Sequence, residues 1–138
     1  MPYPQGMKEL VSTLNKIEIE AAIISLRSDG IVEMRVNNNA NLAVKDAREM
    51  VEAVGKIGNN KKYPLLIVAG KYALADKEAR EYAAGEDGNK YTIAGAFVLR
   101  GLAQKLLGNA YLKVNKPITP TAMFDNEEKA VQWLKTFL

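Results

Sequence analysis

The chain has 138 residues, of which 48% are hydrophobic and 25% charged, and it contains neither cysteine nor histidine. This length suits one domain with a core large enough to need no disulfide or structural metal. The missing thiols and imidazoles exclude Ser–His and Cys–His nucleophiles and the usual Cys/His zinc sites, so neither a metal nor a cofactor is expected. The net charge of +3 is mild and acidic residues are interleaved with basic ones, so no nucleic-acid partner is expected.

The N-terminal residues carry no targeting signal that we can identify. No basic segment leads into an apolar run of signal-peptide length, and no window approaches the roughly 18 apolar residues of a membrane span. We therefore expect a cytoplasmic protein. Residues 1–16 are predicted to form a flexible arm, because prolines and a glycine fall within the first six residues, and residues 17–138 are predicted to form one domain.

The first elements predict a β-hairpin. Residues 17–27 are rich in isoleucine and predict a strand. Residues 28–30 have turn composition, and residues 31–36 alternate apolar with polar side chains, as a second strand does. The asparagine-rich stretch 37–41 is interpreted as a turn or helix cap, because Asn side chains bond to nearby backbone N–H groups.

A parallel βαβ unit follows the hairpin. Residues 42–57 place their apolar side chains on one helical stripe, and Gly58 is expected to end this helix in a left-handed conformation. Residues 65–69 are all apolar, which predicts a strand covered on both faces. The strands at 31–36 and 65–69 should therefore be parallel.

The second half of the chain repeats the alternation. A short helix over 76–84 with Asp76 as its N-cap precedes an apolar strand at 93–98. A helix after Gly101 follows, with an expected inward stripe of Leu102, Ala103, Leu106, Leu107, Ala110 and Val114.

The C-terminal segment supplies a last strand and helix. Residues 121–124 predict a short strand, and Asp125 and Glu128 have the spacing of a capping box. The expected inward stripe of this last helix is Ala130, Val131, Leu134, Phe137 and Leu138, with Trp133 at its edge. The fold class is α/β: a single-layer mixed sheet of four to five strands, hairpin first and βα repeats after it, with helices packed against it.

Three strings and the order of elements resemble a known family. The strings are Asp29-Gly30-Ile31-Val32, residues 101–109 and residues 124–134. They look like the STAS/SEC14-like proteins, small bacterial domains similar to the sporulation anti-sigma-factor antagonist (SpoIIAA-like). The resemblance implies a mixed sheet covered by helices, and relatives that bind protein partners or, in the lipid-transfer branch, small apolar ligands.

The regulatory residue of that family is missing here. Antagonists that act as phosphoswitches carry Ser or Thr at the start of the helix after the central strand, where a phosphate alters partner binding. Residues 70–76 contain neither, and no Ser or Thr occurs between Ser28 and Thr92. A Ser/Thr phosphoswitch is therefore not expected.

The preferred functional hypothesis is a non-catalytic binding or regulatory module that engages a protein partner. Partners of open α/β sheets favour the carboxyl ends of parallel strands, which here lead into residues 70–77. Homodimer formation through a strand edge or a helix face is also compatible with so small a domain. The candidate partner-binding residues are Lys71, Tyr72, Asp76 and Lys77.

The alternative is a carrier of a lipid or small apolar ligand. Its cavity would lie under residues 102–111, with Met123 and Trp133 near the rim, although an apolar stripe at helical spacing is first interpreted as core.

An enzyme built on carboxylates is the third hypothesis, and we do not expect it. Glu18 and Glu20 fall on the solvent side of a strand, and Glu127 and Glu128 suit the first turn of a helix. Glu86 and Asp87 lack the pattern of a calcium loop.

Overall fold

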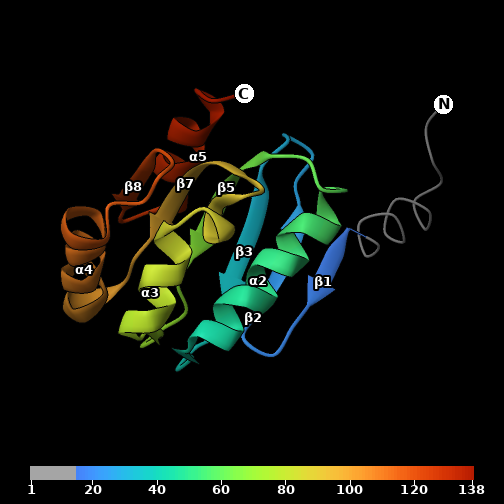
Figure 1. Ribbon diagram of the computed structural model, residues 1–138. Helices are drawn as coiled ribbons and strands as arrows, with labels where there is room; N and C mark the ends of the chain where they lie inside the picture. The colour runs from blue at the N-terminus through green and yellow to red at the C-terminus, as the bar shows by residue number, and fades with distance from the viewer. Residues whose placement is uncertain (1–14) are drawn as a thin grey trace, which may run out of the picture.

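The computed structural model describes residues 15–138 and contains a six-stranded mixed sheet (Figure 1). The predicted arm at 1–16 therefore lies outside the described residues, except for Asn15 and for Lys16, which begins β1. The strand order is β1-β2-β3-β5-β7-β8; the first two pairings are antiparallel and the other three parallel. The strands are β1 (Lys16–Glu18), β2 (Ala22–Leu26), β3 (Val32–Val36), β5 (Tyr63–Val68), β7 (Thr92–Val98) and β8 (Thr121–Phe124).

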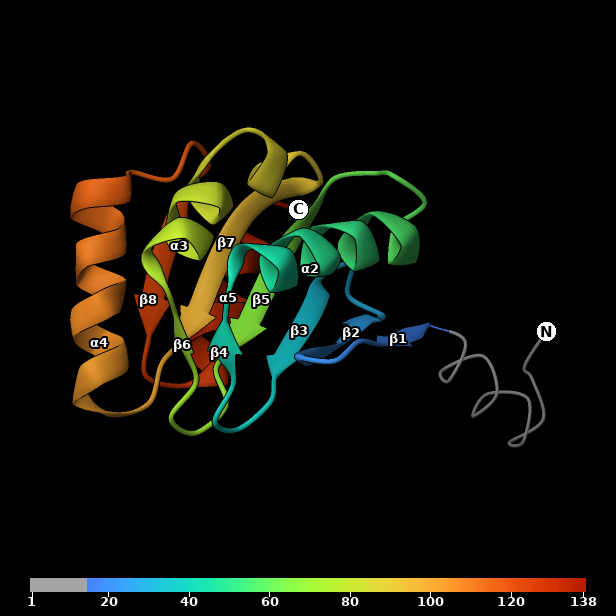
Figure 2. The ribbon, with the colours of Figure 1, turned by 60° about the horizontal axis from the view of Figure 1, so that its bottom comes forward.

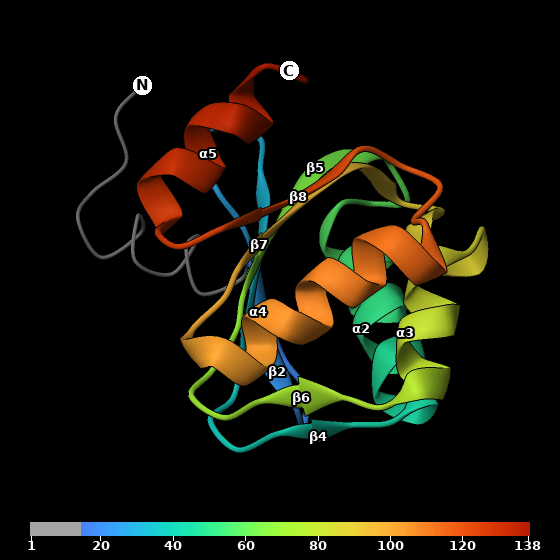
Figure 3. The same ribbon diagram turned by 90° about the vertical axis from the view of Figure 1, so that its left-hand side faces the viewer.

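Helices cover both faces of this sheet. α5 lies on one face, and α2, α3 and α4 lie on the other (Figure 3). The helices are α2 (Val44–Ile57), α3 (Lys77–Ala84), α4 (Gly101–Ala110), α5 (Glu127–Lys135), a 3₁₀ turn η1 (Asp87–Asn89) and a π-helical turn η2 (Tyr111–Asn115) that continues α4. A small parallel ribbon of β4 (Asn41–Leu42) and β6 (Leu74–Ala75) lies below α2 and α3 (Figure 2). No helix within residues 15–138 is both long and apolar enough to cross a bilayer.

The α/β class, the β2–β3 hairpin and the parallel pairing of β3 with β5 confirm the sequence predictions. The sheet has six strands because residues 17–27 form two strands instead of one. The backbone turns between them, with Ile19 N–H donating to Ala22 O at 2.9 Å, and Ile17 then pairs with Ile24. The alternation of apolar residues continues across this turn, so the sequence pattern does not reveal it.

Two helix boundaries differ from the prediction. α2 is not ended by a left-handed Gly58, whose φ is −99°; Asn59 and Asn60 take the left-handed conformation, with φ of 52° and 63°. α5 is capped by Asn126, not Asp125, and the Asn126 side chain accepts a hydrogen bond from Lys129 N–H at 2.8 Å. Asp76 caps α3 as predicted and accepts from Ala79 N–H at 2.9 Å.

The asparagine-rich stretch forms a turn, as predicted, but does not cap α2. Asn39 has a φ of 61°. Asn38 Oδ1 accepts a hydrogen bond from Lys71 N–H at 2.8 Å, which joins the turn after β3 to the turn after β5. α2 instead starts after Ala43, whose N–H donates to the buried carboxylate of Asp46 at 2.8 Å.

The inward face of α4 is not the predicted leucine stripe. Leu102 and Leu106 are 73% and 60% exposed, and Val114 is also exposed. The buried residues are Gln104, Gly108 and Tyr111, which form a different stripe of the helix from the predicted one. Gly108 permits the close approach, because a Cβ there would lie 2.6 Å from Leu99 Cδ1. At the end of the chain Leu138, also predicted to be inward, is exposed, whereas Ala130 and Leu134 are fully buried.

Candidate functional site

An apolar cavity of about 210 Å³ lies between the sheet and helices α2, α3 and α4. For comparison, a dry cavity of about 150 Å³ admits benzene. Its floor is formed by side chains of β3, β5, β7 and β8 that point away from α5, and its walls come from the three helices. The floor and wall residues include Met34, Leu65, Ile67, Gly95, Phe97, Met123, Met50, Val54, Ala79, Arg80, Ala83, Gln104, Leu107 and Tyr111.

Small residues on facing elements leave this space open. Ala79 and Ala83 present only methyl groups from α3. Gly95 on β7 presents no side chain, and the nearest atom to a Cβ built there is Phe97 Cε2 at 3.9 Å. Ile67 is therefore only partly buried although β5 is a central strand of the sheet. Such under-filled space is unusual because protein interiors are close-packed.

Gln104 fixes the α4 wall of the cavity. It is 5% exposed, and its Nε2 donates to Gly70 O at 2.8 Å and to Ala73 O at 2.9 Å. Its Oε1 accepts from Arg100 N–H at 2.7 Å. The side chain thus ties the first turn of α4 to the turn after β5 and satisfies the otherwise free N–H at the start of α4.

Arg80 brings a positive charge to the cavity wall. It stands in the first turn of α3 and is half-buried, and its Nη1 donates to Ala75 O at 2.6 Å. Within residues 15–138 it forms no ion pair with a carboxylate. A second arginine, Arg48 on α2, lies over the ring of Tyr82 at 5.6 Å and holds α2 against α3.

Tyr111 closes the cavity beside Phe97. It is 7% exposed, and the two rings meet edge to face with centroids 5.7 Å apart. Burial raises the pKa of the Tyr111 phenol well above its ordinary value. The hydroxyl, which is protonated at neutral pH in any tyrosine, therefore stays protonated further into alkaline solution.

Of the predicted partner-binding residues, Lys71 and Tyr72 follow the carboxyl end of β5. Tyr72 is 68% exposed, has a φ of 63° and carries Lys71 Nζ over its ring at 5.3 Å. Asp76 and Lys77 follow β6 at the start of α3, where Lys77 pairs with Glu81 at 3.8 Å. Asp76 is engaged as the helix cap, and all four residues are exposed.

The cavity predicted for a carrier is present, with two differences in its lining. Leu107, Tyr111 and Met123 line it as predicted. Leu102 points to solvent, and Trp133 lies on the opposite face of the sheet, packed between Phe124 and Phe137. Trp133 belongs to α5, so it cannot form the rim of a cavity that opens on the α2 side.

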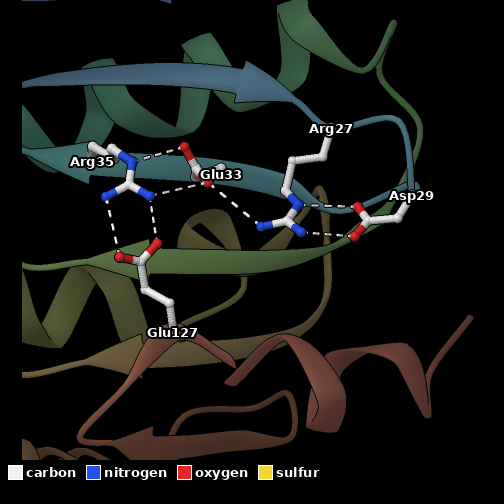
Figure 4. A network of polar contacts seen from close by, with 5 residues as sticks. All are labelled: Arg27, Asp29, Glu33, Arg35 and Glu127. Carbon is white, nitrogen blue, oxygen red and sulfur yellow. Dashed lines mark hydrogen bonds and ion pairs between the residues drawn. The ribbon is translucent and has the colours of Figure 1, made fainter. Parts of the chain in front are cut away.

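Acidic residues on the α5 face form ion pairs with arginines. Glu127 joins a network with Arg35, Glu33, Arg27 and Asp29 on the α5 face, where β3 meets the start of α5 (Figure 4). The hydrogen bond that Arg35 donates to Glu127 raises the pKa of Arg35. Every carboxylate in the network faces an arginine. No group of three acidic residues suited to a metal ion occurs within the part of the chain that the structure describes.

Sequence reasoning missed Arg80 as a site residue. The available signal is its position among small residues: Ala79, Ala83 and Ala84 surround it on α3, and none of them can fill the space between the helix and the sheet. Neither the helical spacing nor the charge pattern distinguishes this arginine from an ordinary surface residue.

A six-stranded mixed sheet with a leading antiparallel hairpin, parallel βα units and helices on both faces is a SpoIIAA-like α/β fold. A crystal structure described as an uncharacterized protein from the DUF3478 family with a SpoIIAA-like fold, from Shewanella loihica PV-4, is similar, with a TM-score of 0.55 and 16% identity over 83% of this chain and 92% of that one. Residues 24–138 match the family described as Domain of unknown function (DUF7793), and the chain belongs to that family. No curated protein matches the sequence.

Proposed function

We propose that this chain is a non-catalytic binding domain whose cavity takes a small, largely apolar ligand. The cavity of about 210 Å³ among α2, α3, α4 and the sheet is the observation that carries the proposal. Concave, mostly apolar pockets with few polar groups are typical of ligand sites, and each buried CH₂ of a ligand contributes about 0.8 kcal/mol.

A neutral apolar probe tests the cavity, and 1-octanol measured by isothermal titration calorimetry serves this purpose. Saturable binding to the wild type is expected. Gly95→Val places a side chain in the cavity and is expected to abolish binding while preserving or raising stability, because glycine in a strand interior costs roughly 0.5–1 kcal/mol.

Gly85→Val is the matched control. Gly85 ends α3 outside the cavity, and a Cβ there meets only Tyr82 O at 3.7 Å and Glu81 O at 3.8 Å. Its affinity for 1-octanol should equal that of the wild type. Absence of saturable binding, or equal binding by the wild type and Gly95→Val, would contradict a ligand-binding cavity.

A protein partner at the surface of Lys71, Tyr72, Asp76 and Lys77 is the second candidate function. The supporting observation is Tyr72, a largely exposed aromatic side chain held at a φ of 63°, a conformation that is costly for a bulky residue. Exposed tyrosines are enriched at protein interfaces. Tyr72→Gly should raise stability by about 1 kcal/mol through relief of this strain and remove any partner that co-purifies.

Gly95→Val separates the two candidate functions. It should leave the Tyr72 surface, and hence any co-purifying partner, unchanged. A partner that remains bound after Tyr72→Gly would exclude this surface as its binding site.

A further inference from the structure

The charge distribution around the cavity is asymmetric. Among the described residues that line it, Arg80 is the one charged side chain; every other lining residue is apolar or an uncharged polar one. None of the described lining residues is acidic. An apolar cavity with a single positive group is complementary to a ligand that has a hydrocarbon part and one negative group.

Arg80, like Arg48 and Arg100, forms no ion pair with a carboxylate within residues 15–138, and of these three arginines it alone lines the cavity. Arg27 is paired with Asp29 and Glu33, and Arg35 with Glu33 and Glu127. Arg80 donates to the backbone oxygen of Ala75, and its other N–H groups donate to no protein atom within residues 15–138. Arg80 and Ala75 both line the cavity, and this bond joins the two residues.

The amide groups in the wall cannot take the place of Arg80. The amide oxygen and the amide nitrogen of Gln104 both form hydrogen bonds with backbone groups. The Nδ2 of Asn89 donates to Ala83 O and Gly85 O, and its Oδ1 accepts from Thr119. A charged ligand group therefore finds its counter-charge at Arg80 and nowhere else among the described lining residues.

We infer that the cavity selects a small amphiphilic carboxylic acid, with its hydrocarbon part against the sheet and its carboxylate on Arg80. The inference rests on the ligand-binding function proposed above. The planar guanidinium matches a carboxylate with two parallel N–H···O bonds, a geometry that a lysine does not reproduce.

Calorimetry at neutral pH with octanoate and 1-octanol tests this assignment. The two probes share a chain length and differ in the charged group. The wild type should bind octanoate at least about tenfold more tightly, since hydrogen bonds to charged groups are stronger than neutral ones. Arg80→Met should reduce octanoate affinity by about the same factor and change octanol affinity by less than about twofold.

Lys77→Met is the matched control for the loss of one positive charge. Lys77 is on the same helix, is exposed, pairs with Glu81 and does not line the cavity, so octanoate binding should be unchanged. Arg80→Lys, which retains the charge, is the second variant should Arg80→Met fail to fold, and it should bind octanoate more weakly than the wild type.

The outcomes separate the two proposals. Equal affinity of the wild type for octanoate and octanol, or an unchanged octanoate affinity in the Arg80 variants, would overturn the carboxylate assignment while leaving the apolar cavity intact as a ligand site. Binding of neither probe would overturn the ligand-binding function and the assignment with it.

Discussion

The two faces of the same sheet are packed in opposite ways. On the α5 face, Leu66 of β5 is fully buried against Ala130 and Leu134, and the polar rim is an ion-pair network in which each charge has a partner. On the α2 face, the next residue of the strand, Ile67, borders a cavity, and Arg80 in its wall has no carboxylate partner within residues 15–138. The α5 face has the properties of a structural core, whereas the other face combines a core around α2 with an under-filled region, which is the proposed binding site.

The largest expected difference is between neighbouring core residues of β5. Leu66→Ala should cost about 2–5 kcal/mol of unfolding free energy, because it opens a new cavity in a filled region. Ile67→Ala should cost only about 1–2 kcal/mol, because this side chain already borders open space. Urea denaturation measures both. Equal losses would mean that the two faces are packed alike.

The wall formed by α4 depends on one polar side chain. Gln104→Leu removes the bonds to Gly70 O and Ala73 O and leaves those carbonyls without their side-chain donor. We expect a loss of about 1–3 kcal/mol, together with faster hydrogen exchange across α4. Exchange that rises equally in α5 would show that the loss is global and not confined to the cavity wall.

Alkaline pH should weaken the cavity face through Tyr111. The raised pKa means that the phenol stays protonated in the folded state while it ionises in the unfolded state above about pH 10. Its contribution to stability is therefore complete below that pH and falls as pH rises, by up to about 1.4 kcal/mol per pH unit.

Tyr111→Phe isolates this effect from the other titrating residues. The difference in stability between the wild type and the variant should change in favour of the variant above about pH 10. A constant difference across this range would contradict burial of the phenol.

The smallest expected effect is on the ion-pair network of the α5 face. Arg35 and Glu127 side chains are 46% and 40% exposed, so solvent screens their attraction. Glu127→Gln should cost at most about 1 kcal/mol, and less at high salt. Thermal unfolding at low and high salt measures this, and a large salt-independent loss would assign the network a role in the core instead.

Sequence reasoning predicted the elements well where periodicity or composition determines them. The apolar runs of β5 and β7, the amphipathic stripe of α2 and the Asp76 cap are all local patterns, and all are present. The exposure of Leu102 and Leu106 could not be predicted, because helical spacing defines an apolar stripe but does not show which face of the helix a neighbouring element covers.

The cavity itself depends on contacts between segments far apart in the chain. Gly95 on β7 and Ala83 on α3 are each unremarkable in their own segment. They leave space only because the fold brings both of them to the lining of one cavity. The sequence supported a carrier as an alternative hypothesis, but it could not rank that hypothesis above a filled core, and it gave no reason to choose Arg80 among five arginines.

Methyl NMR during a titration with 1-octanol shows whether the cavity takes an apolar ligand. We expect saturable shifts of the Ile67 and Leu65 methyl groups, which line the cavity, and little change at Leu66, which faces α5 on the same strand. The absence of saturable shifts, or shifts of equal size on both faces of β5, would contradict a ligand-binding cavity in this domain.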